Sequence, residues 1–248
     1  MIAVRDPIQT PADVLPDSHL TLSVIVPCYN EVENIERVIE RVQAVGLADE
    51  IIVVDDGSTD GTRDVLRRLQ AEEPPNLHVL YHDRNQGKGA AVVTGLRCAT
   101  CDVILIQDAD LEYDPRDYPA LLKPIAEGIA TVVYGSRFLS GSRKAMNFWN
   151  MVANKTLVLL TNILYNAILS DVSTCYKVFR REVRENMVIH SRRFDFEPEF
   201  TAKVLKTGTR IYEVPVSYNG REWDEGKKIR WTDAPIALWT VIKYRFVN

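Results

Sequence analysis

The stretch VVDDGSTDGT (Val53–Thr62) is an apolar run that ends abruptly in clustered carboxylates. A second stretch, LIQDADLEYDP (Leu105–Pro115), repeats this arrangement. A buried strand that gathers acids at its carboxyl end needs a cation to offset their desolvation, and ligands of parallel sheets bind outside those strand ends. Asp108 and Asp110, separated by the small Ala109, suit a hard divalent cation, Mg²⁺ or Mn²⁺, that bridges the phosphates of a bound nucleotide.

Apolar runs alternate with amphipathic stretches along the chain, which is typical of repeated βα units. The expected strands lie near residues 21–26, 50–55, 77–81, 102–107 and 130–134, and the expected helices near 31–45, 60–72, 87–99 and 116–127. Repeated βα units imply an α/β fold with a mostly parallel sheet and helices on both faces.

The composition is that of an ordinary enzyme rather than a nucleic-acid-binding protein. The 248 residues are 46% hydrophobic and 26% charged, with a net charge of −4. This charge offers no general attraction to nucleic acid, so local basic groups must hold any anionic ligand. The four cysteines lack the spacing of a disulfide framework, and the pair Cys98 and Cys101 lacks two further ligands for zinc. They indicate reduced thiols in a cytoplasmic protein.

Each expected strand ends in a polar cluster. In chain order the clusters are PCYNE (27–31), DDGSTDGT (55–62), DRNQGKGAA (83–91), DAD (108–110) and GSR (135–137). Some members have an ordinary structural explanation, because Asn30, Ser58 and Asp60 are residue types that favour helix caps and turns. No capping need explains Asp108 and Asp110 after the run VILI.

Lys88 stands between two glycines at the start of an expected helix. The motif is not a dinucleotide fingerprint, because Val92 occupies the position of the third glycine. It is not a Walker loop, because His82 replaces the leading glycine and Gly89 follows the lysine. We therefore expect Lys88 to support a nearby acid or phosphate.

Five motifs in a fixed order carry a family resemblance. They are LSVIVPCYNEVENI, IIVVDDGSTDGT, NQGKGAAVVTGL, DADLEYDP and YGSRF. Together they resemble the Rossmann-like nucleotide-sugar domain of family-2 glycosyltransferases, which have the GT-A fold. Within that family the chain is most similar to the dolichyl-phosphate and polyprenyl-phosphate hexose synthases. The resemblance covers about Leu20 to Phe246.

Prolines among acids in residues 1–19 predict a flexible tail. The resemblance implies a single catalytic domain over 20–248, with a nucleotide-sugar half (20–137) and an acceptor-side half (138–248), and it implies a reaction. The implied reaction is an inverting, metal-dependent transfer of a hexose from a nucleoside diphosphate sugar to a polyprenyl or dolichyl phosphate.

Carried over position by position, the resemblance implies a donor site. Its residues are Pro27, Tyr29, Glu31, Val54, Asp55, Asp56, Lys88, Asp108, Ala109 and Asp110. Asp108, Asp110 and Glu112 would bind the metal, with Asp110 making the more direct contact. Glu112 falls where the mannosyl members carry a glutamine ligand, so it keeps an oxygen donor and adds a charge.

Basic residues complete the implied site. Arg137, Arg221 and Lys227 match basic positions of the similar synthases, and with Asp110 they form the expected catalytic set. Arginine suits bidentate phosphate recognition and lysine suits point-charge neutralisation. Arg137, Lys177 and Arg221 would hold the acceptor phosphate. We expect the loop that carries Arg221 and Lys227 to be mobile and to close on bound phosphates.

The segments DVSTCYKVF (Asp171–Phe179) and FDFEPEF (Phe194–Phe200) bear on the donor and on catalysis. In the first, the pair Cys175 and Tyr176 replaces a Gly-aromatic pair of the mannosyl type, which favours a UDP-linked hexose over GDP-mannose. The acids of the second precede a helix, where carboxylates commonly complement the helix dipole.

Alternatives to a phosphate acceptor stay open. A phosphate monoester is mostly an anionic nucleophile at neutral pH, since its second pKa is about 6, and it needs no strong base. A family-2 transferase that acts on the hydroxyl of a small molecule, protein or glycan would instead make Glu112, Asp195 or Glu197 essential as a base. A non-catalytic nucleotide-sugar-binding module is a third possibility.

Two segments raise the question of a membrane partner. Asparagines recur at roughly helical spacing in Ala145–Ser170, which predicts an amphipathic helix that either lies on a bilayer or packs against the sheet. Asp233–Phe246 ends with alternating aromatic and basic residues, as in interfacial helices. We expect a cytoplasmic protein that is peripheral on the membrane face.

Overall fold

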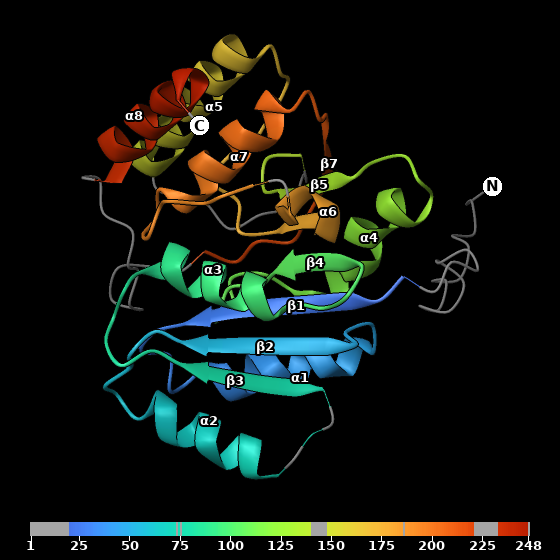
Figure 1. Cartoon of the computed structure of the whole chain (residues 1–248), viewed down its shortest axis with the longest axis vertical. Coiled ribbons are helices and arrows are strands. Elements are labelled where there is room, and N and C mark those ends of the chain that lie inside the picture. The colour runs from blue at the N-terminus through green and yellow to red at the C-terminus, as the bar shows by residue number, and fades with distance from the viewer. Residues whose placement is uncertain are drawn as a thin grey trace, which may run out of the picture.

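A seven-stranded sheet forms the centre of the computed structural model, in the order β3-β2-β1-β4-β6-β5-β7 (Figure 1). The structure describes residues 20–72, 74, 76–139, 148–185, 187–220 and 233–247. The expected flexible tail over residues 1–19 lies outside this part of the chain.

The sheet is mostly parallel, as predicted. Its strands are β1 (Leu22–Cys28), β2 (Glu50–Asp55), β3 (Leu77–Tyr81), β4 (Val103–Ile106), β5 (Val132–Ser136), β6 (Lys177–Arg180) and β7 (Ile211–Pro215). Among the strands of the described residues, only β6 runs antiparallel to its neighbours, β4 and β5. The sequence did not predict β6 and β7, because β6 is four residues long and opens with a lysine, and β7 shows no long apolar run.

Helices cover both faces of the sheet. They are α1 (Ile35–Val45), α2 (Thr62–Ala71), α3 (Lys88–Cys98), α4 (Tyr118–Ala126), α5 (Phe148–Tyr165), α6 (Arg181–Glu185), α7 (Phe196–Lys206) and α8 (Asp233–Phe246), with a short 3₁₀ turn, η2 (Pro115–Asp117). Figure 1 shows α3 in front of the sheet beside β1, and α1 behind β2 and β3. The predicted α/β architecture is confirmed.

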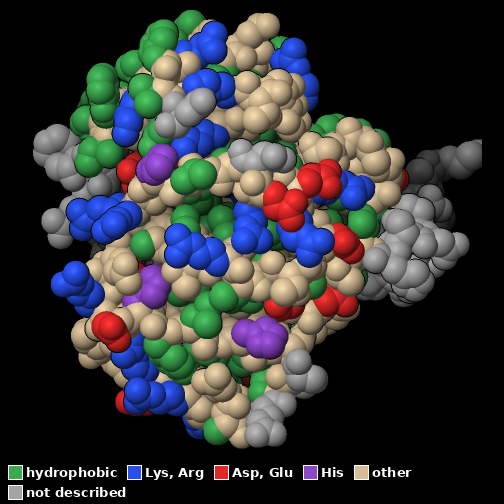
Figure 2. All heavy atoms as spheres, in the orientation of Figure 1, with side chains coloured by type: hydrophobic (Ala, Val, Ile, Leu, Met, Phe, Trp, Pro, Cys, Tyr) green, Lys and Arg blue, Asp and Glu red, His purple; other side chains and the backbone are tan. Residues whose placement is uncertain are grey.

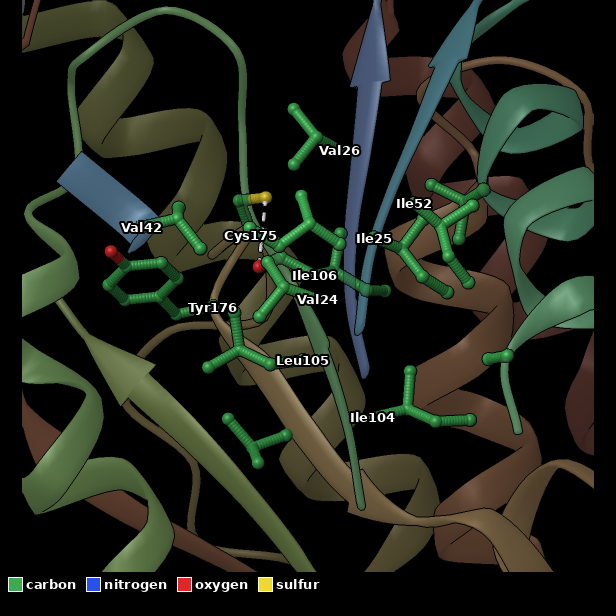
Figure 3. Packing of buried hydrophobic residues seen from close by; sticks show 14 of the residues in the cluster. Val24, Ile25, Val26, Val42, Ile52, Ile104, Leu105, Ile106, Cys175 and Tyr176 are labelled. Atoms are coloured by element: carbon green, nitrogen blue, oxygen red, sulfur yellow. Dashed lines mark hydrogen bonds between the residues drawn. The ribbon is translucent and has the colours of Figure 1, made fainter. Parts of the chain in front are cut away.

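The core explains why the central strands are continuous apolar runs. Helices enclose both faces, so Ile25, Ile52 and Ile104 are fully buried (Figure 3). On α3, Gly95 permits close packing, because a Cβ there would lie 2.5 Å from Cγ2 of Ile25. Figure 3 also shows Cys175 beside β4, with its Sγ 3.7 Å from the Ile106 carbonyl oxygen.

The helices α5, α7 and α8 pack together at one end of the molecule (Figure 1). They share a small apolar cluster, formed by Leu157, Val158, Leu169, Val172 and Val241. The predicted helix is confirmed as α5, but the expected polar outer face is not, because Asn154 and Thr161 are buried. The outward side of α5 instead carries apolar residues.

Candidate active site

The turn after β4 carries the two acids of the DAD motif. Gln107 anchors this turn from below, because its Oε1 accepts hydrogen bonds from the hydroxyls of Tyr118 (2.8 Å) and Tyr176 (2.9 Å). Its Nε2 donates to the carbonyl oxygen of Asp108 at 3.0 Å. Asp108 and Asp110 are therefore held on a rigid base at the carboxyl edge of the sheet.

Lys88 reaches this edge from the first residue of α3. Its Nζ lies 2.8 Å from Asp108 Oδ1 and 2.8 Å from Glu197 Oε1 of α7. Burial opposes the charge of Lys88, but the neighbouring carboxylates outweigh it and hold its pKa well above the ordinary value. Burial would likewise raise the pKa of Asp108, and the ammonium lowers it below the usual value. Lys88 thus supports a nearby acid, as predicted.

The predicted three-carboxylate metal set is not assembled. In the described ranges, no group of three or more His, Cys, Asp or Glu side chains converges on one point. The chain turns at Leu111, which has a φ of 62°, and Glu112 accepts a hydrogen bond from the Tyr218 hydroxyl at 3.0 Å. The role of Glu112 as a metal ligand therefore stays a prediction. Asp108 and Asp110 still fit, since Mg²⁺ is commonly held by one or two carboxylates together with substrate phosphates.

The residues predicted around the base and ribose lie at the ends of β1 and β2. Tyr29 is partly exposed there, and Pro27 and Glu31 are buried beside it. Glu31 Oε2 accepts from the Asn34 amide at 2.9 Å. Val54, like Ala109 of the DAD turn, is buried beneath this edge.

Asp55 and Asp56 organise loops. The Asp55 side chain is fully enclosed and forms an ion pair with Arg63 at 2.6 Å. Asp56 accepts from His82 Nδ1 (2.7 Å) and from the backbone N–H of Gly87 (2.8 Å). The prediction that Asp55 contacts the donor is wrong, because its carboxylate is enclosed and pairs with Arg63. Asp56 shapes the loop that presents Lys88.

Asn30, Ser58 and Asp60 have structural roles as loop contacts and not as helix caps, because the N-cap residues are Asn34 for α1 and Gly61 for α2. Asn30 Oδ1 accepts from the backbone N–H of Thr59 at 2.9 Å, and Ser58 Oγ accepts from Asn30 N at 2.9 Å. Asp60 Oδ1 accepts from Thr62 N at 3.0 Å, at the start of α2. These three side chains fix the loops beside Tyr29.

Arg137 forms one wall of the site from the end of β5. Its Nε and Nη2 donate to Asp171 Oδ2 (2.6 Å) and Oδ1 (2.8 Å), and only 9% of the residue is exposed. The guanidinium lies 5.1 Å from the ring centroid of Tyr218. Asn154 also donates to Asp171, at 3.3 Å. A role of Arg137 toward the acceptor phosphate stays a prediction.

The prediction that Lys177 holds the acceptor phosphate is wrong. Lys177 is fully buried, and its Nζ donates to the carbonyl oxygens of Thr174 (2.6 Å) and Val172 (3.1 Å). It also lies 4.3 Å from the ring centroid of Tyr134. Burial lowers the pKa of Lys177 to about 8. The lysine therefore fixes the chain before β6 and does not face a ligand.

Arg221 and Lys227 belong to a stretch, residues 221–232, that lies outside the described residues. Their phosphate-binding role and the closing of their loop stay predictions.

Sequence reasoning did not assign Glu197 and Asp171 their roles. Glu197 fits the pattern of a helix-start acid, but its carboxylate pairs with Lys88. The spacing of FDFEPEF could have indicated this position. Phe196 and Phe200 are buried, and Glu197 between them is buried as well. Asp171 had no such signal, since a lone acid before a short strand is usually solvated.

The fold is a mostly parallel α/β sheet with clustered acids at its carboxyl edge, and comparison with known proteins identifies the family. A family model described as Glycosyl transferase family 2 matches residues 23–188. The chain belongs to this family and is a glycosyltransferase.

Among relatives, a polyprenol monophosphomannose synthase from Mycolicibacterium smegmatis is 30% identical over 94% of this chain and 91% of its own length. An undecaprenyl-phosphate mannosyltransferase from Micrococcus luteus is 30% identical over 82% of this chain and 85% of its own. A similar solved structure is glucosyl-3-phosphoglycerate synthase from Mycobacterium tuberculosis in complex with Mn²⁺, uridine diphosphate and phosphoglyceric acid. Its TM-score is 0.74 at 21% identity, with 98% of this chain and 85% of that chain covered. The GT-A fold is thereby confirmed.

Proposed function

We propose that this chain transfers a hexose from a nucleoside diphosphate sugar to a polyprenyl phosphate. The observation that carries the proposal is the likeness, along most of the chain, to enzymes named for polyprenol monophosphomannose, undecaprenyl phosphate and dolichol phosphate. The acidic edge of the sheet supports it, because this is where ligands of parallel sheets bind.

Asp108 and Asp110 would hold the divalent cation. When bound, such an ion neutralises the charge that develops on a leaving diphosphate. The chain's own residues supply the orientation: Gln107 fixes the turn, and Asp110 Oδ1 accepts from the backbone N–H of Glu112 at 3.2 Å. Lys88 adds a positive charge beside Asp108.

The carboxylates that a hydroxyl acceptor would need as a base are engaged elsewhere. Glu197 pairs with Lys88, and Glu112 accepts from Tyr218. Asp195 accepts from the backbone N–H of Arg193 at 2.9 Å. A phosphate acceptor needs no such base, since it is already mostly anionic at neutral pH. These contacts favour the lipid phosphate over the hydroxyl acceptor.

The sugar follows from two observations that point in different directions. Cys175 and Tyr176 favour a UDP-linked hexose, and the names of the relatives specify mannose. Because the relatives match along most of the chain and the pair is a local feature, we favour mannose.

A donor panel tests the proposal. The purified protein is incubated with Mg²⁺ or Mn²⁺, a short polyprenyl phosphate and one of GDP-mannose, UDP-glucose or UDP-galactose. We expect a glycolipid of hexosyl polyprenyl phosphate mass with GDP-mannose. Product only with a UDP-hexose would overturn the choice of sugar and keep the class, and no glycolipid with any donor would refute the proposal.

The lipid acceptor calls for a membrane-facing surface, and the α5–α8 face provides one. We define this face by its exposed apolar side chains: Phe148, Trp149, Leu159, Ile163, Ile236, Trp239 and Phe246. Figure 2 shows hydrophobic and basic side chains side by side over the end of the molecule where α5 and α8 lie. Trp239 is 63% exposed and Ile163 69%. Exposed apolar patches are typical of protein and membrane interaction sites.

Charge completes the match to a bilayer with anionic lipids. Lys155, Lys243 and Arg245 are exposed on the same two helices, and α5 contains no acidic residue. Apolar and basic side chains together are typical of interfacial helices. None of the described helices is long and apolar enough to span a membrane. Asn154 on the inner side of α5 contacts Asp171 of the site wall, so the membrane and the site would lie on two sides of one helix.

We expect the double variant Ile163→Glu, Trp239→Glu to lose at least about tenfold in affinity for vesicles of phosphatidylcholine and phosphatidylglycerol, because it puts two charges on the face that enters the interface. Vesicle co-sedimentation measures this. Ile129→Glu is the matched control, since Ile129 is 61% exposed but follows α4. Equal binding of the double variant and the wild type, or an equal loss in the control, would rule out this face.

A further inference from the structure

Lys88 joins two carboxylates that come from different halves of the chain. Asp108 follows β4 in the nucleotide-sugar half, and Glu197 lies in the first turn of α7 in the acceptor-side half. Both carboxylate oxygens lie 2.8 Å from the same Nζ, and the side chains of Lys88, Asp108 and Glu197 are 16%, 20% and 8% exposed. This shielding from water makes the charge balance of the trio matter.

The backbone at the start of α3 lies close to the backbone of the segment that precedes α7. Ala90 N, in the first turn of α3, donates to the Arg192 carbonyl oxygen at 3.0 Å. A Cβ at Gly89 would lie 2.7 Å from the Ser191 carbonyl oxygen, so only glycine allows this approach. The segment that leads into α7 is therefore seated on the start of α3, which places Glu197 against Lys88.

The net charge of this group indicates a role for Glu197 besides its interaction with the helix dipole. Asp108, Asp110 and Glu197 with the Lys88 ammonium carry a formal net charge of −2, which matches a divalent cation. Without the charge of Glu197 the group would carry a net charge of −1, and Lys88 would form an ion pair with Asp108 alone. An ammonium paired with one acid alone competes with a cation for that acid.

We propose that Glu197 is a positioning residue of the donor site. By sharing Lys88 with Asp108, it keeps Asp108 oriented and its charge available to the cation and diphosphate. The proposal rests on the metal-dependent function proposed above. It also explains why the two halves of the chain meet at this lysine: an acceptor-side helix sets the electrostatics of the donor-side acid.

The test is Glu197→Gln, which keeps the shape and a hydrogen-bond acceptor for Lys88 but removes the charge. Binding of Mn²⁺ is measured in the presence of UDP and, separately, of GDP, from the electron paramagnetic resonance signal of free Mn²⁺. We expect an increase of about tenfold in the Kd for Mn²⁺, because the site loses one negative charge. Unchanged Mn²⁺ binding would overturn the proposal.

Two further variants separate charge from structure. Glu199→Gln alters a buried acid of the same helix that pairs with Lys203 at 2.7 Å, so we expect a lower melting temperature and Mn²⁺ binding within about twofold of wild type. The double variant Lys88→Met, Glu197→Gln restores the net charge of −2, and we expect its Mn²⁺ affinity to recover toward wild type. A double variant that binds no better than Glu197→Gln would show a structural role only.

The outcome also distinguishes this proposal from the proposed function. Mn²⁺ binding that is insensitive to Asp110→Asn would refute the metal site itself. Binding that weakens in Asp110→Asn but not in Glu197→Gln would refute only the role of Glu197.

Discussion

Replacing Asp110 by asparagine is expected to lower hexosyl transfer by roughly 100-fold or more, because the variant weakens the ion that neutralises the leaving diphosphate. The fold should persist. Asparagine keeps the Oδ1 that accepts from the backbone N–H of Glu112, so the turn after β4 retains its shape. The measurements are the rate of glycolipid formation and the melting temperature of each protein.

Asp114→Asn is the matched control for this variant. Asp114 lies on the same loop and accepts hydrogen bonds from Arg116, whose side chain is 86% exposed. We expect the control to keep its activity, since no part of the predicted donor site involves it. An Asp110→Asn enzyme with the wild-type rate, or a wild-type enzyme that is fully active in excess chelator, would contradict the proposed metal dependence.

Replacing Asp171 by alanine is expected to destabilise the protein by about 3–5 kcal/mol, since it leaves a buried guanidinium without its carboxylate partner. The side chains of Arg137 and Asp171 are 10% and 0% exposed, and the guanidinium and the backbone N–H of Arg137 together donate three hydrogen bonds to Asp171. The free energy of unfolding in urea measures the effect. The pair of the exposed Arg116 and Asp114 is the contrast, and Arg116→Ala should change stability by less than about 1 kcal/mol.

The double variant Arg137→Met, Asp171→Leu separates the buried charge from packing. It removes both charges together, so we expect it to be more stable than Asp171→Ala. A change of less than about 1 kcal/mol in Asp171→Ala would contradict the view that this pair braces the site wall. Equal losses in the single and the double variant would show that packing alone matters there.

The sequence could predict the part of the fold in which strands and helices alternate along the chain. Buried parallel strands are continuous apolar runs, so β1, β2 and β4 stand out, and so do the acids at their ends. The antiparallel strand β6 gave no such signal. Its first residue, Lys177, is fully buried beneath carbonyl oxygens, and a lysine is almost never enclosed without a partner.

The candidate site shows the same limit. Asp108 and Asp110 were predictable, because no capping role explains two acids after an apolar run. Their neighbours were not: Lys88 and Glu197 are more than one hundred residues apart in the chain, and only the packing of α7 against α3 brings them together. The prediction for Asp55 was wrong because an acid at a strand end can bind either a ligand or an arginine inside the protein. The local sequence does not distinguish these two cases.

In the proposed reaction the nucleophile is a phosphate carried by a lipid. To test this, the protein, with one active donor and Mg²⁺ or Mn²⁺, receives either a short polyprenyl phosphate or the corresponding free polyprenol, and mass spectrometry identifies the products. We predict hexosyl polyprenyl phosphate from the first and no glycosylated product from the second, because the described site holds its candidate base carboxylates in other contacts. Glycosylation of the free alcohol at a comparable rate would contradict the account.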